Sequence, residues 1–403
     1  MKTNRGPLLF LLALACVLAM SASAHGAWVT TQVDTDGNVG FLTSLAQDPV
    51  FNYPHISYYD RTNSSLKYAS WGGSAWNTQT VDNWGYVGPY SSLAFYNNDA
   101  PRISYTSYTY NGATKVPNGI KYAYWIGGYW HIEFVQAGTN VGEYTSLAVD
   151  ATGRSHVSYY DRSTGTLKYA VQNGTAWGDS QTVDAVGDVG PNSSLNSSLK
   201  LDTNGNPRIA YHNETNGTLM YAAYDGSPWQ RTIVDASAHV GAHPSLALTS
   251  AGNPIISYFD SSNMDLKLAM YNGVWNVSIV DAVGIVGFGN SLALDPETDL
   301  PRIAYASGNP EAGDTDLKLA YWDDTASAWQ YEYVDTPGIV GEYPSLALDP
   351  TTGVPMVSYY DRTNGNLKFA MPAGAIMPEP TTLGLLAIGA IAAYTRRSRA
   401  RRR

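Results

Sequence analysis

The pattern that indicates the fold is clearest in Trp329-Gln-Tyr-Glu-Tyr-Val-Asp335-Thr-Pro-Gly-Ile-Val-Gly341-Glu-Tyr-Pro-Ser345-Leu346, followed by Pro355-Met-Val-Ser-Tyr-Tyr-Asp361 and then by Leu367-Lys-Phe-Ala370. Versions of the same pattern follow six other tryptophans at intervals of 46 to 54 residues, namely Trp28, Trp76, Trp130, Trp177, Trp229 and Trp275. Seven copies of a unit of about 50 residues indicate a closed repeat architecture.

Each copy holds four short alternating segments that are separated by Gly, Asn, Asp or Pro, which is typical of four antiparallel strands. The chain has 30 Tyr, 11 Trp and 38 Gly and only 14% charged residues, a composition that favours strands and turns over helices. Four strands in each of seven copies predict an all-β fold, a seven-bladed β-propeller.

The connection lengths predict the order of the strands in a blade. The Leu-Lys-Tyr-Ala segment reaches the next Trp through a tight turn, such as Asn173-Gly174, so these two segments form a hairpin. The longest constant connection runs from the Trp segment to the Ser-Leu segment of the next copy. We therefore assign Ser-Leu to the innermost strand A, Pro-x-Ile-Ser-Tyr to B, Leu-Lys-Tyr-Ala to C and the Trp segment to the outermost strand D.

The ends of the repeat predict how the ring closes. The first segment, Trp28 to Val33, has the pattern of a D strand, whereas the last, Leu367 to Ala370, has that of a C strand. The first segment should therefore complete the seventh blade as its outer strand, within a propeller that spans residues 25–372.

The chain begins with the pattern of a secretory signal peptide. Residues 1–24 combine a basic start, the apolar run from Leu8 to Met20 and the small-residue site Ala22-Ser23-Ala24, which predicts export and cleavage by signal peptidase after Ala24. The only cysteine, Cys16, lies in this segment. The mature chain therefore has no thiol to oxidise outside the cytoplasm.

The other end resembles the PEP-CTERM sorting signal of Gram-negative bacteria. Residues 373–380 form a linker that ends in Pro378-Glu379-Pro380, an apolar stretch runs from Leu383 to Ala393, and residues 396–403 hold six arginines. The resemblance implies recognition by an exosortase, cleavage near the motif and delivery to the cell surface or extracellular matrix. Residues 381–395 are predicted to form a short transmembrane helix with a cytoplasmic arginine-rich end, and an ordinary short membrane anchor is the alternative.

The charge of the middle of the chain excludes one class of partner. Eight of the 24 basic residues and one of the 34 acidic residues lie in the two ends, so the middle carries a net charge of −17. Such a surface repels phosphate backbones, and we expect no nucleic-acid partner.

Four B segments, in copies 1, 3, 5 and 7, end in an aromatic residue and an aspartate. Aromatic rings that cover the apolar face of a sugar, with nearby carboxylate acceptors, are typical of carbohydrate sites. The alternative is that each aspartate caps the turn that follows and each ring packs between blades. The candidate ligand-binding residues are Tyr59, Asp60, Tyr160, Asp161, Phe259, Asp260, Tyr360 and Asp361.

Residues that break the repeat are further candidates. His212 and Glu214 replace the usual end of strand B in copy 4, and His239 and His243 lie in the connection that leaves this copy. We include His212 and Glu214 among the ligand-binding candidates, and the histidines are candidate ligands of a transition metal. Solvated surface histidines are the alternative.

A single acidic stretch resembles part of a calcium loop. It contains Asp34, Asp36 and Asn38 but lacks the distal glutamate of an EF-hand. Calcium at these three residues is therefore the only cofactor hypothesis, and otherwise we expect none.

The connections from C to D, such as Tyr224 to Trp229, loosely resemble the Asp-box turns of sialidase-type propellers, although the Ser and the Asp-to-Gly spacing of that box are missing. Sialidases need three arginines that converge on a carboxylate. Arg102, Arg208 and Arg302 start B strands in alternate copies, so we expect them to be dispersed around the ring.

These observations predict an exported, non-catalytic binding or adhesion module at the cell surface or in the extracellular matrix. Its expected partner is a polysaccharide or a surface protein, and contact with the membrane is expected only through the C-terminal segment. Two alternatives stay open: a glycan-cleaving enzyme of the sialidase or lyase kind, and a purely structural surface protein.

Overall fold

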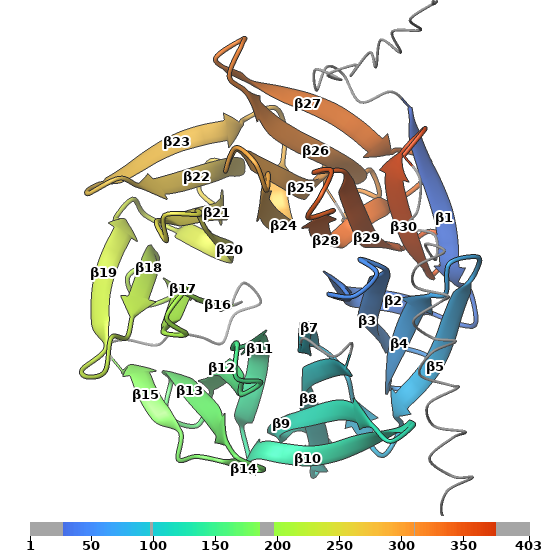
Figure 1. Ribbon diagram of the computed structural model, residues 1–403, viewed down its shortest axis with the longest axis vertical. Helices are drawn as coiled ribbons and strands as arrows, with labels where there is room; N and C mark the ends of the chain where they lie inside the picture. Colours follow the sequence, from blue (N-terminus) through green and yellow to red (C-terminus); the bar gives the residue numbers. More distant parts are fainter. Residues whose placement is uncertain (1–26, 97–99, 186–196, 310, 376–403) are drawn as a thin grey trace, which may run out of the picture.

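The computed structural model describes residues 27–96, 100–185, 197–309 and 311–375. These residues form seven antiparallel sheets that radiate from a common axis, which confirms the predicted seven-bladed propeller (Figure 1). The predicted signal peptide, the Pro378-Glu379-Pro380 motif and the predicted transmembrane segment 381–395 lie outside the described residues. Within the described ranges there is no helix that is long and apolar enough to cross a membrane.

Each blade has its strands in the predicted order, from the axis outward. Blade 1 consists of β2 (Val39–Gln47), β3 (Pro54–Asp60), β4 (Ser65–Trp71) and β5 (Trp76–Asp82). Blade 2 consists of β6 (Tyr86–Val87) and β7 (Ser92–Tyr96), then β8 (Ala100–Asn111), β9 (Thr114–Ile126) and β10 (Tyr129–Ala137). Blade 3 consists of β11 (Val141–Val149), β12 (Ser155–Asp161) and β13 (Thr166–Asn173), with β14 (Ala176–Trp177) and β15 (Gln181–Asp184) outermost.

The other four blades follow the same plan. Blade 4 consists of β16 (Ser198–Leu201), β17 (Pro207–Asn213), β18 (Thr218–Ala223) and β19 (Gln230–Asp235). Blade 5 consists of β20 (Val240–Leu248), β21 (Pro254–Asp260), β22 (Asp265–Tyr271) and β23 (Trp275–Asp281). Blade 6 consists of β24 (Val286–Leu294), β25 (Pro301–Ser307), β26 (Asp316–Asp323) and β27 (Ala328–Asp335). Blade 7 consists of β28 (Val340–Leu348), β29 (Pro355–Asp361), β30 (Asn366–Pro372) and β1 (Trp28–Asp34).

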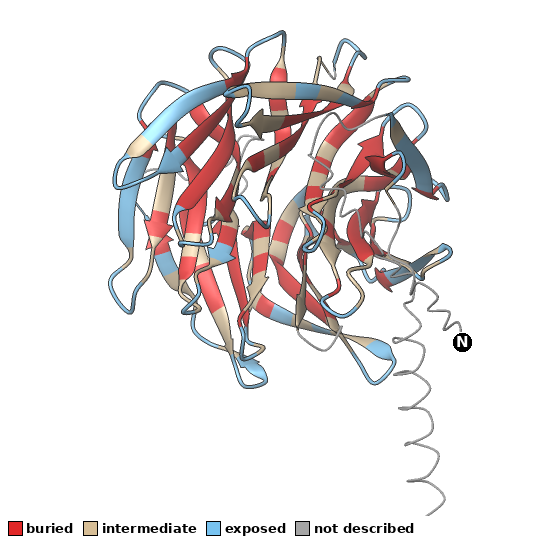
Figure 2. Cartoon of the chain, turned by 45° about the horizontal axis from the view of Figure 1, so that its top comes forward, coloured by how far each residue is buried: buried red, intermediate tan, exposed pale blue. Residues whose placement is uncertain are grey.

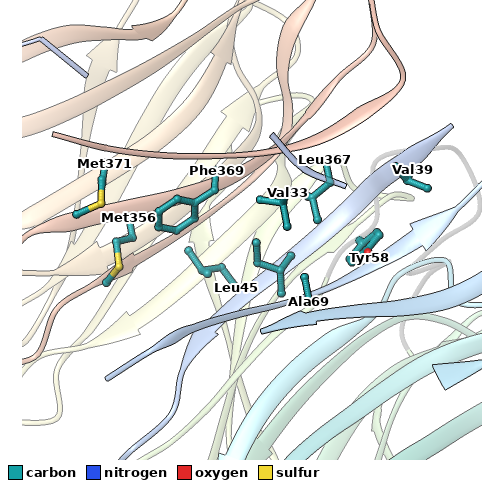
Figure 3. Packing of buried hydrophobic residues seen from close by; sticks show 10 residues of the cluster. Val33, Val39, Leu45, Tyr58, Ala69, Met356, Leu367, Phe369 and Met371 are labelled. Atoms are coloured by element: carbon teal, nitrogen blue, oxygen red, sulfur yellow. The ribbon is translucent and has the colours of Figure 1, made fainter. Parts of the chain in front are cut away.

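The ring closes through the first strand of the chain, as predicted. β1 pairs antiparallel with β30, with Trp28 opposite Pro372 and Thr31 opposite Phe369. Val33 packs with Phe369 and with Leu45 of blade 1 in one buried cluster (Figure 3). Two ends of the chain thus share one core, and the last blade cannot form fully without the first strand.

A ring of serines joins the innermost strands. In every blade the strand A serine accepts a hydrogen bond at 2.9 or 3.0 Å from the backbone N–H of the strand A leucine in the next blade. Only a small side chain fits where the blades converge, which explains the invariant Ser-Leu pattern of the repeat. The accepting residues are Ser44, Ser92, Ser146, Ser198, Ser245, Ser291 and Ser345.

Buried ion pairs join the outer strand of one blade to strands B and C of the next. At the junction between blades 5 and 6, Asp281 at the end of strand D accepts from Tyr305 at 2.7 Å and from Lys318 at 2.6 Å. The same three residue types meet at four other junctions. These contacts explain the repeated Val-Asp, Ser-Tyr and Leu-Lys pairs. The interior of each blade is buried, whereas the outer strands and turns are exposed (Figure 2).

Candidate functional site

The four aromatic-aspartate pairs that end strand B are buried. The Oδ1 atom of Asp60 accepts the backbone N–H of Asn63 at 3.0 Å, and its Oδ2 atom accepts from the Asn63 amide at 2.8 Å. Asp161, Asp260 and Asp361 receive corresponding bonds from their own turns. The structure therefore gives these carboxylates the turn-capping role. The adjoining rings of Tyr59, Tyr160, Phe259 and Tyr360 are at most 8% exposed.

The irregular histidines gather at the junction between blades 4 and 5. Burial and the nearby His239 lower the pKa of His212 to about 4, and burial and His212 lower the pKa of His243 to about 4. The Oε2 atom of Glu214 lies 3.4 Å from Nδ1 of His212. Nevertheless, in the part of the chain that the structure describes, no three His, Cys, Asp or Glu side chains are arranged to hold a metal ion.

The residues of the calcium hypothesis have protein partners. Asp34 accepts from Tyr58 at 2.6 Å, pairs with Lys67, and caps the backbone N–H of Asp36 with its other oxygen. The side-chain oxygen of Asn38 accepts from the hydroxyl of Tyr360 at 2.8 Å. These contacts are those of a closed inter-blade junction.

The three arginines belong to separate junctions on the face formed by the A-to-B and C-to-D turns. Arg102 donates to the backbone oxygen of Gly153 at 2.6 Å, and Arg302 donates to Asp295 at 2.8 Å. Arg208 lies in blade 4 and pairs through Nη2 with two carboxylates. Each arginine thus has its own partners, and Arg208 also lines a pocket.

This pocket lies between blades 4 and 5 and has a volume of about 390 Å³. Three rings line it: the Tyr221 and Trp275 centroids are 5.5 Å apart, and the Tyr271 and Trp275 centroids are 5.2 Å apart. Asp225, Gln230, Thr232 and Asn253 add polar groups around the opening. We call this the Arg208 pocket.

The strand pattern explains why the pocket forms at this junction. The residue after the first Pro of strand B lies diagonally across from a residue of strand C, and the Trp of the next blade covers both. In blade 5 these positions hold Ile255 and Leu268, which pack with Trp329 in one apolar cluster. In blade 4 a guanidinium occupies the first position. Its polar atoms need partners. Arg102, at the same position of blade 2, reaches Gly153 of the next blade, whereas Arg208 turns to Asp202 and Asp225 of its own blade.

Arg208 keeps one nitrogen without a hydrogen-bond partner. Its Nη2 atom lies 2.6 Å from Asp202 and 2.6 Å from Asp225, whereas its Nη1 atom is buried and forms no hydrogen bond. Burial opposes the charge, but the two carboxylates raise the pKa of Arg208 above its ordinary value. A buried hydrogen-bond donor without a partner costs free energy. A ligand oxygen that accepted from this nitrogen would remove that cost and so contribute strongly to binding.

The sequence did not predict the Arg208 pocket. Arg208 was visible only as one of three dispersed arginines, and its aromatic neighbours had the pattern of core residues. The available signal was the contrast with Ile255 and Met356, which hold the equivalent position in blades 5 and 7.

No known protein family matches the sequence, and no curated protein is similar to it. Solved structures do share the fold. AofleA from Arthrobotrys oligospora is 11% identical with a TM-score of 0.52, over 77% of this chain and 90% of that one. A polysaccharide lyase described as an ulvan lyase is 13% identical with a TM-score of 0.54, over 84% of this chain and 95% of that one. These similarities extend to the fold alone.

Proposed function

We propose that the protein is a non-catalytic polysaccharide-binding module and that the Arg208 pocket receives one sugar unit. One observation carries this proposal: a buried guanidinium nitrogen without a partner lies in a pocket lined by three aromatic rings. Aromatic faces cover the C–H side of a sugar ring, while a fixed donor orients its oxygens.

The pocket has the further groups that such binding needs. Arg208 Nη1 would donate to a sugar oxygen, and the side chain of Asp225, which is 53% exposed, would accept from a hydroxyl. Gln230, Thr232 and Asn253 add donors and acceptors at the opening. Two carboxylates already balance the charge of Arg208, so the pocket favours a neutral sugar over a phosphate or sulfate.

The comparisons are compatible with this ligand class. A solved ulvan lyase of similar fold, at 12% identity and a TM-score of 0.54, is described as bound to a glucuronate and sulfated rhamnose repeat. This neighbour supports the proposal only in one respect: a fold of this kind can present a surface to a polysaccharide.

Binding to neutral glycans, measured by a glycan array and then by calorimetry, tests the proposal. Arg208→Met copies Met356 of blade 7, and we expect it to weaken binding by about tenfold or more. Arg302→Met is the matched control, because it removes an arginine from the equivalent position of blade 6 without altering the pocket. Equal binding by Arg208→Met and the wild type would refute the proposal, and appearance of cleaved products would favour the enzyme alternative.

We also propose export to the cell surface or matrix with the help of signal peptidase and an exosortase. This part rests on the sequence of residues 1–24 and of Pro378-Glu379-Pro380. Replacing the three motif residues by alanine should leave the uncleaved protein in the membrane fraction. Unchanged processing and release of this variant would contradict the proposal.

A further inference from the structure

Blade 2 carries an extension that the other blades lack. Strand B has seven residues in the other six blades, but β8 has 12 residues and its partner β9 has 13. Ser107 of β8 corresponds to Asp60 of β3, where strand B of blade 1 ends. The hairpin from Tyr108 to Pro117 therefore continues past the face formed by the B-to-C and D-to-A connections. This face is opposite to that of the Arg208 pocket.

Aromatic residues cover one side of this extension. Tyr108 and Tyr110 are two residues apart on β8 and therefore lie on the same face of the strand. Tyr86 of β6 is opposite Tyr108, and Lys115 of β9 is opposite Tyr110. The centroids of Tyr86 and Tyr110 are 5.1 Å apart, and Lys115 Nζ lies 4.8 Å from the Tyr86 centroid and 4.6 Å from the Tyr108 centroid. We call Tyr86, Tyr108, Tyr110 and Lys115 the tyrosine ribbon.

Beside the ribbon lies an aromatic residue that the fold does not need. Trp84 precedes Tyr86 in the same connection and is 87% exposed, and Tyr110 is 52% exposed. The six other copies hold small, polar or aliphatic residues at this position, namely Asp36, Gly138, Val186, Ser237, Val283 and Pro337. Exposed rings that cluster in this way mark interaction sites rather than core.

The ribbon leads towards the central channel. The hydroxyl of Tyr108 donates to Glu143 of blade 3 at 3.1 Å, and the rings of Tyr90 and Tyr144 meet at 4.3 Å between these blades. Tyr90 lines the pocket of about 180 Å³ at the mouth of the channel. The left-handed backbone of Tyr90 and Tyr144 belongs to the repeat, because Leu42, His243, Gly289 and Tyr343 adopt it at the same position of other blades.

The ribbon also carries a cation that is not neutralised. Among the described residues Lys115 has no ion pair, whereas the neighbouring Arg162 pairs with Glu143 at 2.7 Å. The middle of the chain has a net charge of −17, so an uncompensated cation between tyrosine rings is a local exception. Such a site complements an anionic group attached to a ring that can stack.

We infer that the tyrosine ribbon, with Trp84, is a second polysaccharide site that binds an acidic chain running towards the channel mouth. Tyr86, Tyr110 and Trp84 would stack on successive sugars, and Lys115 would pair with a carboxylate or sulfate. The inference rests on the proposed function only in its ligand class, because its residues, face and expected charge preference differ from those of the Arg208 pocket.

Binding of the full chain to polygalacturonate, dextran sulfate and neutral dextran tests the inference, and the two acidic polymers distinguish uronate from sulfate. We expect the tyrosine ribbon to bind at least one of the acidic polymers and not to bind dextran. The double variant Trp84→Ser/Tyr110→Ser should weaken this binding by about tenfold or more, and Lys115→Gln by about threefold. Tyr129→Ser, which alters an exposed ring on β10 of the same blade, should have no effect.

Wild-type protein that binds neither acidic polymer, or a double variant that binds as the wild type does, would overturn the inference. Both substitutions are at exposed positions, and an unchanged melting temperature checks that the fold is intact. Arg208→Met separates the two proposals. If it abolishes neutral-glycan binding and preserves acidic-polymer binding, both sites stand; if it leaves neutral-glycan binding intact, only the Arg208 pocket is refuted.

Discussion

Two junctions of the ring use the same three positions in opposite ways. Between blades 7 and 1 they hold Met356, Phe369 and Trp76, which pack in one buried cluster with the last two rings 5.2 Å apart. Between blades 4 and 5 they hold Arg208, Tyr221 and Trp275, and a pocket opens between the rings. The scaffold is thus the same, and the two junctions differ in this residue of strand B and in the partners it finds, since Arg102 and Arg302 hold the same position in blades 2 and 6 and have other partners.

The closed junction depends most on β1. Deletion of residues 27–34 removes the outer strand of blade 7 and the Asp34 partner of Tyr58 and Lys67. We expect a fall in melting temperature of about 10 °C or more in calorimetry. Asp34→Asn keeps the strand and should cost much less, and a deletion variant that melts like the wild type would contradict the closure.

Exchanging the strand B residue between these two junctions should destabilise only the closed junction. Met356→Arg places a cation among apolar side chains, and we expect a loss of about 3 kcal/mol or more in the free energy of unfolding measured with urea. Arg208→Met should change it by about 1 kcal/mol or less, because the two carboxylates are partly exposed or bound to their own turns. Equal effects of the two variants would mean that the junctions do not differ as described.

The two junctions should also differ in their response to pH. His212 and His243 are buried and neutral at the junction between blades 4 and 5, whereas Tyr360 and Leu42 hold these positions between blades 7 and 1. The unfolded chain binds each proton near pH 6.5 and the folded chain only near pH 4. Acid therefore favours unfolding below pH 6.5.

Each histidine should cost about 2 kcal/mol of unfolding free energy between pH 7 and pH 5. Urea unfolding across this range measures how the unfolding free energy depends on pH. His212→Phe should remove the part of this pH dependence that is due to His212. If the slope in this range is the same in His212→Phe and the wild type, the assignment to this histidine is wrong.

The smallest contrast lies nearer the axis. Between blades 7 and 1 the hydroxyl of Ser358 donates to Thr43 at 2.9 Å, whereas Ala210 and Pro244 hold these positions between blades 4 and 5. A double-mutant cycle of Ser358→Ala and Thr43→Val should give a coupling of about 1 kcal/mol. Ala210→Ser places a hydroxyl at a fully buried position where Pro244 offers no side-chain partner, so it should lower the stability by about 1 kcal/mol or more. A gain in stability there would contradict the role given to the Ser358 and Thr43 pair.

The fold could be predicted because every blade repeats the same sequence pattern. The tryptophan period, the tight turn at Asn173-Gly174 and the D-like pattern of Trp28 to Val33 each follow from neighbouring residues, so the strand order and the closure were confirmed. The signal peptide and the sorting motif stay predictions.

The sites could not be predicted in the same way, because they depend on residues that meet across blades. Nothing near Arg208 in the sequence indicates that Trp275 covers it. Tyr160 and Asp161 had the composition of a sugar site, but their repetition reflected the turn and the packing that every such blade requires. The informative positions were departures from the repeat such as Trp84 and Lys115, whereas Arg208 shares its place in the pattern with Arg102 and Arg302.

A crystal structure with the tightest-binding neutral oligosaccharide tests whether the Arg208 pocket binds a sugar. We expect one sugar ring stacked on Trp275 with an oxygen within hydrogen-bonding distance of Arg208 Nη1. An oligosaccharide bound elsewhere, with the pocket unoccupied, would contradict this expectation.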